Sequence, residues 1–218
     1  MADSASASSP AVDGAAAAAA ATLDGAAAEE GGAAYVAGGT SDVAALMGMD
    51  SEDESLRKYK ESLLGAAASG DLGDTSDGRR VVVTEFRIEF EEDGVDDFVA
   101  ELDTPEKTAA LAAQLVSIKQ GAQYKLRISF KVNGEIVDSL KFKTVTKRGL
   151  ISQSDEIMIG SYAPSSTPNV FVSPRDGWQY APEGMVFRGK YNCYCDFVDL
   201  HGESHLAFKW SIKIGKTW

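Results

Sequence analysis

The stretch Tyr124-Lys125-Leu126-Arg127-Ile128-Ser129-Phe130-Lys131-Val132 alternates large apolar with polar side chains. A period of two is typical of a β-strand with one face in a core and the other in water, because successive side chains point to opposite faces. The same alternation recurs in residues 86–90, 140–143, 191–197 and 206–214. Roughly eight such strands, joined by short turns without long helices, predict an all-β fold, an antiparallel β-sandwich.

Two dipeptides between these runs are typical of tight turns. Asn133-Gly134 stands between two alternating runs and predicts a type I′ hairpin, and Asp93-Gly94 predicts a second turn.

The chain divides into three parts by composition. Residues 1–39 are rich in Ala, Gly, Ser and Asp and nearly free of large apolar side chains, so they are expected to be disordered. Residues 40–80 are expected to form an arm with two short helices and a linker, and residues 81–218 the sandwich. Residues 1–80 carry 14 acids and 5 bases, so most of the net charge of −12 lies there.

The arm contains two helical patterns. Ser41 is expected to cap the first, which ends at Gly48, and Ser51-x-x-Glu54 resembles a capping box at the start of the second. In the second helix Leu56, Tyr59 and Leu63 share one face. Helices this short are not stable alone in water, so this apolar face needs a surface to bury it. Ala66–Gly78 is expected to be a flexible linker.

Charge and composition exclude several function classes. The acidic balance argues against nucleic-acid binding, since no basic face is available for phosphates. It also argues against docking on anionic lipid by electrostatics alone. No apolar run is long enough to span a membrane. Only two cysteines, Cys193 and Cys195, are present, at a spacing that suits a disulfide poorly, which favours a cytoplasmic protein.

Signals for catalysis are weak. Gly215-Lys216-Thr217 lacks the first glycine of a phosphate-binding loop and precedes no helix. His201 and His205 fit a solvated turn better than a catalytic or metal site. Cys193 and Cys195 lack further ligands at the spacing of a zinc site. We therefore expect no enzyme activity, no cofactor and no metal.

The expected inner face of the sandwich mixes large and small side chains. Phe208 and Trp210 are large, whereas Cys193 and Cys195 are small. Ordinary core packing explains such a mixture, and a cavity for an apolar ligand is the sharper alternative.

Several segments, in order and with matching spacing, resemble Rho GDP-dissociation inhibitors. They are Glu54-Ser55-Leu56-Arg57-Lys58-Tyr59-Lys60-Glu61-Ser62-Leu63-Leu64-Gly65, residues 124–133, Met158-Ile159-Gly160-Ser161-Tyr162, and Pro182-Glu183-Gly184-Met185 with Arg188-Gly189. The resemblance covers about residues 50–218, and the acidic tail with divergent turns favours a plant member.

This resemblance implies an immunoglobulin-like sandwich that shelters the geranylgeranyl group of a prenylated Rho-type small GTPase, preferably GDP-bound. It implies a transient encounter with the membrane, extraction of the GTPase and slowed GDP release. By position, the prenyl pocket would be lined by eight residues: Ile88, Val116, Tyr124, Ile136, Val186, Cys193, Phe208 and Trp210.

The resemblance also assigns the arm to the GTPase. Asp53 would accept a hydrogen bond from the first switch region, and Leu56 and Tyr59 would make apolar contacts. A generic soluble shuttle for lipids or prenyl groups, without control of nucleotide exchange, is the alternative. Such a shuttle would not need the arm.

Overall fold

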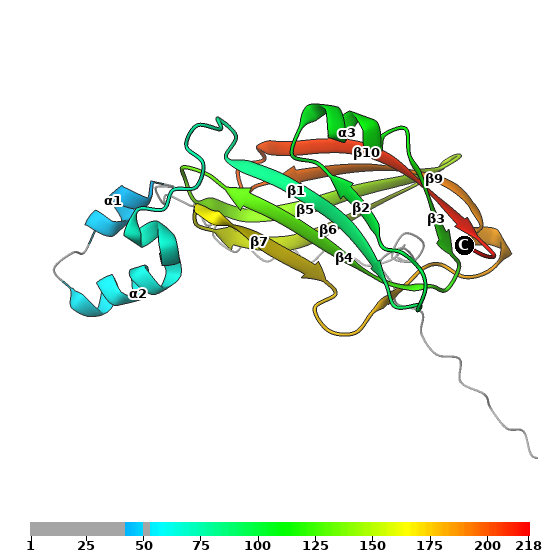
Figure 1. Ribbon diagram of the computed structural model, residues 1–218, viewed down its shortest axis with the longest axis horizontal. Coiled ribbons are helices and arrows are strands. Elements are labelled where there is room, and N and C mark those ends of the chain that lie inside the picture. Colours follow the sequence, from blue (N-terminus) through cyan, green and yellow to red (C-terminus); the bar gives the residue numbers. More distant parts are fainter. Residues whose placement is uncertain (1–41, 50–52) are drawn as a thin grey trace, which may run out of the picture.

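The protein is built of two five-stranded sheets packed face to face, as the computed structural model describes for residues 42–49 and 53–218 (Figure 1). The expected disordered segment 1–39 and the expected caps Ser41 and Ser51 lie outside the described residues. The N-caps of the two arm helices are instead Asp42 and Asp53. The first sheet has the order β2-β1-β4-β7, with β8 paired to β4. Its strands are β1 (Val81–Phe90), β2 (Phe98–Glu101), β4 (Gln123–Val132), β7 (Ser165–Ser173) and β8 (Gln179–Tyr180).

The second sheet has the order β3-β10-β9-β5-β6. Its strands are β3 (Leu115–Lys119), β5 (Val137–Arg148), β6 (Ile151–Tyr162), β9 (Gly189–Val198) and β10 (Ser204–Gly215). The described residues thus confirm the all-β sandwich expected from the alternating runs.

One strand pair departs from the antiparallel expectation, because β3 runs parallel to β10. Between β2 and β3 the chain crosses from the first sheet to the second through α3 (Pro105–Leu111). Thr104 caps this helix by accepting from the Lys107 N–H, and proline at its start supplies a suitable backbone angle. The crossover brings β3 beside the last strand of the chain in the same direction.

The core forms where the alternating faces of the two sheets meet. Phe130 and Phe197 are fully buried, and Phe86 of β1 packs edge-on against Trp210 of β10 at a centroid distance of 5.3 Å. Full burial of such a side chain contributes about 1.5–3 kcal/mol. The period-two pattern therefore indicates correctly which side chains face inward.

The expected hairpin at Asn133-Gly134 is wrong, because β4 and β5 belong to different sheets. Gly134 has a φ of 73°, but Asn133 does not have the positive φ that a type I′ turn requires. The Asn133 side chain instead accepts from the Asp74 N–H and donates to the Arg79 carbonyl. The turn is thus held by the segment before β1. The turn at Asp93-Gly94 is confirmed, and it joins β1 to its antiparallel partner β2.

The segment expected to be a flexible linker is hydrogen bonded to the sandwich. Asp71 accepts from the backbone N–H and the hydroxyl of Ser166, and Gly134 N–H donates to the Leu72 carbonyl. Arg80 pairs with Asp199 at 2.8 Å. Residues 70–80 therefore pack as part of the sandwich, although composition assigns them to the arm.

The arm consists of α1 (Val43–Gly48), α2 (Glu54–Leu64) and the short η1 helix (Gly65–Ser69), and it lies at one end of the sandwich (Figure 1). A small apolar cluster, separate from the main core, joins these helices to the sandwich. Its members are Val43, Met47, Leu64, Ala67, Ala68, Leu72, Ile136 and Ala163. The Lys60 ammonium group also donates to the Leu46 carbonyl at 3.0 Å, which ties α2 to α1.

Candidate functional site

An apolar cavity of about 270 Å³ lies between the two sheets. This volume is slightly below the usual 300–1,000 Å³ of a small-molecule site. The lining comes from both sheets: Phe86, Ile88, Ile118, Tyr124, Leu126, Phe142, Thr144, Thr146, Asp155, Glu156, Ile157, Cys193, Cys195, Trp210 and Ile212. The arrangement offers an extended apolar chain a place between two layers, with a few polar groups on β5 and β6.

Four of the eight residues assigned to the prenyl pocket line this cavity together. They are Ile88, Tyr124, Cys193 and Trp210. Trp210 and Cys193 are direct cross-strand partners, so their side chains share one face of the second sheet.

The structure places the other four elsewhere. Phe208 lies beside α3 and touches the cavity wall indirectly, since its ring is 5.7 Å from that of Phe86. Ile136 belongs to the cluster under the arm. Val186 is exposed in the η2 helix (Met185–Phe187).

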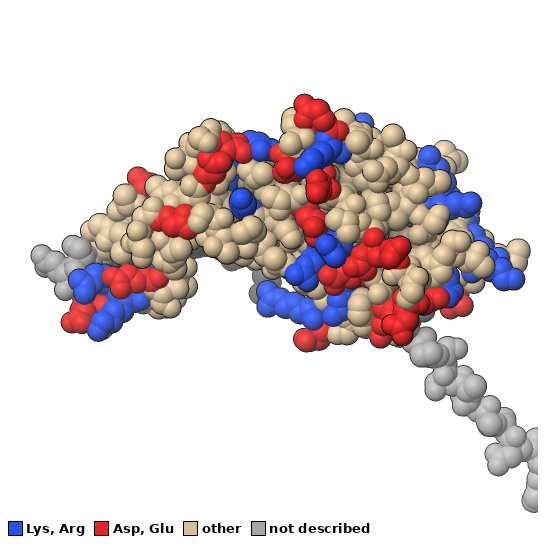
Figure 2. All heavy atoms as spheres, viewed as in Figure 1, with Lys and Arg blue, Asp and Glu red and all other residues tan. Residues whose placement is uncertain are grey.

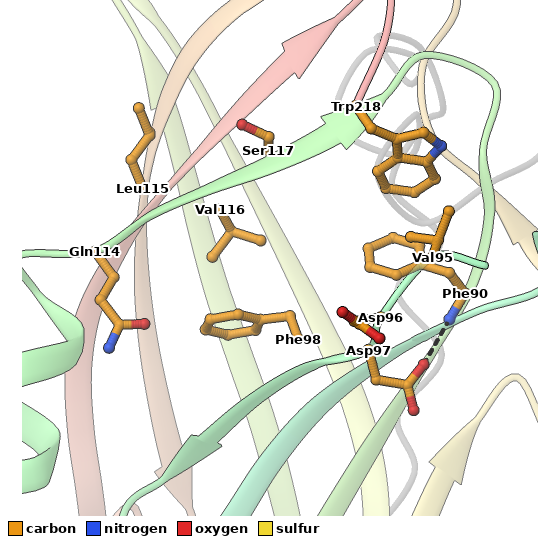
Figure 3. Close-up of a pocket in the computed structure, with 10 residues that line it drawn as sticks. All are labelled: Phe90, Val95, Asp96, Asp97, Phe98, Gln114, Leu115, Val116, Ser117 and Trp218. Carbon is orange, nitrogen blue, oxygen red and sulfur yellow. Dashed lines mark hydrogen bonds between the residues drawn. The ribbon is translucent and has the colours of Figure 1, made fainter.

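Val116 lines a separate open groove of about 550 Å³ between the turn after β1 and strand β3 (Figure 3). Phe98 and Val116 lie together on one side of this groove, and Phe90 and Trp218 on the other. The ring of Phe98 stacks on Trp210 at 5.9 Å. One aromatic pair therefore separates the groove from the cavity between the sheets.

Several lining residues were missed, although the alternation could have found some of them. Phe86 has the same strand parity as Ile88, Cys195 as Cys193, and Ile212 as Trp210. Thr144 and Asp155 are cross-strand partners that face inward without being apolar, so hydropathy gave no signal for them.

The two cysteines contribute soft, uncharged surface. Burial raises the pKa of Cys193 to about 11 and that of Cys195 to about 12, so both stay protonated thiols. The Trp210 indole N–H donates to the Cys195 sulfur at 3.4 Å. The cavity is thus lined by neutral thiols with little nucleophilic character.

Asp155 lines the cavity, and its surroundings disfavour its charged form. Burial raises its pKa above the ordinary 3.8, against a smaller opposing hydrogen bond from Gln153. Its neighbour Glu156 instead pairs with Lys141 at 2.8 Å, which lowers the Glu156 pKa. An apolar environment disfavours the charged form of a carboxyl group. An apolar ligand in the cavity is therefore more compatible with the protonated form of Asp155 than with the charged form.

The arm presents an apolar row to solvent. Leu56, Tyr59 and Leu63 are all exposed on α2, whereas Leu64 turns toward the sandwich. Asp53 is the N-cap of this helix, and its Oδ1 accepts from the backbone N–H groups of Ser55 (2.9 Å) and Leu56 (3.2 Å). The apolar face expected to need a partner is thus unburied within the described chain.

Comparison with known proteins places this geometry in a family. The family described as RHO protein GDP dissociation inhibitor matches residues 21–217. The chain belongs to the Rho GDP-dissociation inhibitor family. The putative rho GDP-dissociation inhibitor 1 of Dictyostelium discoideum is 35% identical over 185 residues, which cover 84% of this chain and 91% of that protein.

Two further relatives of this inhibitor family come from yeast and human. The Rho GDP-dissociation inhibitor of Schizosaccharomyces pombe is 35% identical and covers 79% of this chain and 81% of its own length. Human Rho GDP-dissociation inhibitor 1 is 34% identical, and the match covers 78% of this chain and 79% of that protein. The family is one of regulators rather than enzymes. Membership of the plant branch stays a prediction.

A charge cluster around the buried Asp199 lies at the arm end of this inhibitor fold. Arg80 contacts Asp199 and Glu203, and His205 Nε2 lies 3.2 Å from Asp199. Burial opposes the charge of Asp199, but hydrogen bonds from the Glu203 and His201 backbone N–H groups hold its pKa below 3.8. The expectation of a solvated His205 is wrong, since its side chain is buried.

Asp199, Glu203 and His205 are close enough to share a metal ion. The Arg80 guanidinium, however, already lies against both carboxylates and supplies the positive charge. We assign this cluster to fixing the start of β1 on the loop before β10.

The described helices include none that is long and apolar enough to cross a membrane.

Proposed function

We propose that this protein binds Rho-type small GTPases in their prenylated, GDP-bound form, slows GDP release and removes them from membranes. The observation that carries the proposal is the apolar cavity between the sheets of a chain that belongs to this family. No covalent chemistry is required, and the carrier would work in the cytoplasm.

The geranylgeranyl group would enter between the two sheets. Tyr124 and Ile88 of the first sheet and Cys193 and Trp210 of the second would contact it. At about 270 Å³ the cavity is small for such a chain, so the sheets would separate further as the lipid enters. Val116 and Phe208 lie just beyond the aromatic walls, where an enlarged cavity would reach them.

The lipid alone cannot account for extraction. A chain of about 20 carbons gains on the order of 10 kcal/mol or more on leaving water, at about 0.8 kcal/mol per methylene. A bilayer offers nearly the same gain. Contacts with the GTPase itself must therefore supply the difference.

The arm would supply those contacts. Leu56 and Tyr59 are exposed on the same face of α2 and would pack on the GTPase switch regions. Asp53, at the start of the helix, would accept a hydrogen bond from the first switch. Binding the closed switches better than the open ones shifts the population away from the state that releases nucleotide.

The test compares prenylated with unprenylated Rho-type GTPase, each loaded with fluorescent GDP, in nucleotide-release and vesicle-extraction assays. We expect inhibition of release for both forms, at much lower protein concentration for the prenylated one, and extraction of the prenylated one. Equal affinity for both forms would exclude a role for the cavity.

A deletion separates this proposal from a generic shuttle. The deletion should remove residues 1–69 and keep the chain from residue 70, because residues 70–80 are bonded to the sandwich. The shortened chain should still bind a prenylated peptide but no longer slow GDP release. A shuttle would extract lipidated GTPase equally well without residues 1–69.

A further inference from the structure

Four lysines gather on the outer face of the second sheet. Lys147 of β5, Lys190 of β9 and Lys209 and Lys213 of β10 are all exposed, and we call them, with Tyr194 at their centre, the lysine face. The ammonium groups of Lys147 and Lys209 lie over the Tyr194 ring, 5.1 and 5.4 Å from its centroid. This face is basic although the whole chain has a net charge of −12.

The lysine face is not neutralised by ion pairs within the described residues, although Asp196 lies on the same face of β9. Within residues 42–49 and 53–218, none of the four lysines forms a salt bridge with a carboxylate, whereas Lys141 and Lys143 on the same sheet share Glu156. Lys190 and Lys213 are direct cross-strand partners. Like charges in that position destabilise a sheet, so the fold gains nothing from this pairing by itself.

Two exposed apolar turns border the same end of the sheet. Leu150 and Ile151 form the tip of the β5–β6 hairpin, and Met185 and Val186 lie in η2; the exposed fractions of these side chains run from 69% to 105%. Arg148 Nη1 donates to the Val186 carbonyl and joins the two turns. We call these four residues the apolar tips.

The tips, Lys147, Lys190 and Lys213 lie toward the end of the sandwich opposite the arm, and Lys209 and Tyr194 lie in the middle of their strands. Lys147 is three residues from Leu150, and Lys190 is four residues from Val186. Lysine and arginine side chains gather along the right-hand edge of the molecule in Figure 2, where β9 and the end of β10 lie in Figure 1.

We propose that the lysine face and the apolar tips together dock on the surface of an anionic phospholipid membrane. Lysines attract acidic headgroups, and exposed aliphatic side chains beside them insert at the headgroup boundary. The apolar tips favour a lipid surface over an acidic protein or nucleic acid, which would need no such insertion. The purpose of the docking rests on the proposed carrier function, because it would bring the cavity to the membrane that holds the prenylated cargo.

The test measures binding of the full chain, without GTPase, to phosphatidylcholine vesicles with and without phosphatidylserine. We expect binding that requires phosphatidylserine and weakens as salt shortens the reach of the charges. Each lysine near an anionic surface contributes about fivefold in affinity, so Lys190→Gln with Lys213→Gln should weaken binding about 25-fold. Leu150→Ser with Met185→Ser should weaken binding at every salt concentration.

The matched control is Lys125→Gln with Lys131→Gln, which removes the same charge from β4 of the other sheet. It should leave vesicle binding close to that of the parent. The proposal is overturned if the parent ignores phosphatidylserine, if both lysine pairs have equal effects, or if heparin is bound as tightly and the tip variant matches the parent. Inhibition of GDP release, measured without vesicles, should be unchanged in the lysine variants, so a failed carrier function and a failed docking face are told apart.

Discussion

Filling the cavity between the sheets is the sharpest test of where the prenyl group binds. Cys193 faces the cavity opposite Trp210, in the middle of β9. Cys193→Phe places a ring in the space that the lipid would use. A Phe side chain buries at least about 150 Å², and the lipid would lose contact over a similar area.

The magnitude follows from that area. At about 25 cal/mol per Å², losing 150 Å² of apolar contact costs roughly 4 kcal/mol. That corresponds to about a thousandfold in affinity for a prenylated ligand. Overpacking a core costs about 1–3 kcal/mol of folding stability, which a β-sandwich of this size should survive.

The assay is a titration of the full chain with a fluorescent geranylgeranylated peptide, with the thermal midpoint of each variant measured in parallel. Val170→Phe is the control, since Val170 is exposed on β7 of the first sheet. It should bind as the parent does. A folded Cys193→Phe protein that binds the peptide within threefold of the parent would refute the assignment of this cavity to the lipid.

Three further predictions concern single acids. Asp53→Asn keeps the helix cap but removes the charge, so it should weaken inhibition of GDP release by roughly tenfold to a hundredfold, as loss of a charge-assisted hydrogen bond does; if Asp53→Ala weakens inhibition while Asp53→Asn does not, Asp53 acts only as a cap. Because the pKa of Asp155 is raised in the folded protein, its charge costs stability as pH rises above 3.8 and through the folded-state pKa. Asp155→Asn should therefore raise the thermal midpoint at neutral pH but not below pH 3.8, and an equal shift at both pH values would contradict this reasoning. The lowered pKa of Asp199 means that its charge stabilises the fold at neutral pH, a contribution lost as pH falls below 3.8. Asp199→Ala should cost about 3 kcal/mol in urea unfolding, because it removes the buried partner of both Arg80 and His205 and leaves Arg80 only the more exposed Glu203 and Glu135; a loss under about 1 kcal/mol would show the cluster to be dispensable.

Alternation in the sequence identified the inner face of each strand but not the position along it. Tyr124 and Trp210 were expected to face inward, and both do. Val116 also faces inward, yet the stacked rings of Phe98 and Trp210 separate it from the cavity. A period of two specifies a face, whereas depth within the sandwich depends on how far each strand is shifted against its neighbours.

Features set by contacts distant in sequence could not be found from local patterns. The Asn133 side chain binds Asp74, 59 residues earlier, and that contact replaces the expected hairpin. His205 is buried because Arg80 and Asp199 meet beside it, 119 residues apart. Ile136 and Val186 lie in a turn and a short helix, where strand parity does not apply.

Net charge was the least informative number, because it averages over regions with opposite character. The −12 of the chain argues against electrostatic docking on anionic lipid, yet four lysines that make no salt bridge within the described residues share the outer face of the second sheet, and three of them lie toward the end opposite the arm. The cavity lies toward that end too, since Cys193 and Thr146 are near Lys190 and Lys147 along β9 and β5. The arm packs at the other end, against Ile136 and Ala163. A GTPase held by the arm would therefore have its lipid tail sheltered near the membrane-facing end, so that the lipid has the shortest path between bilayer and cavity.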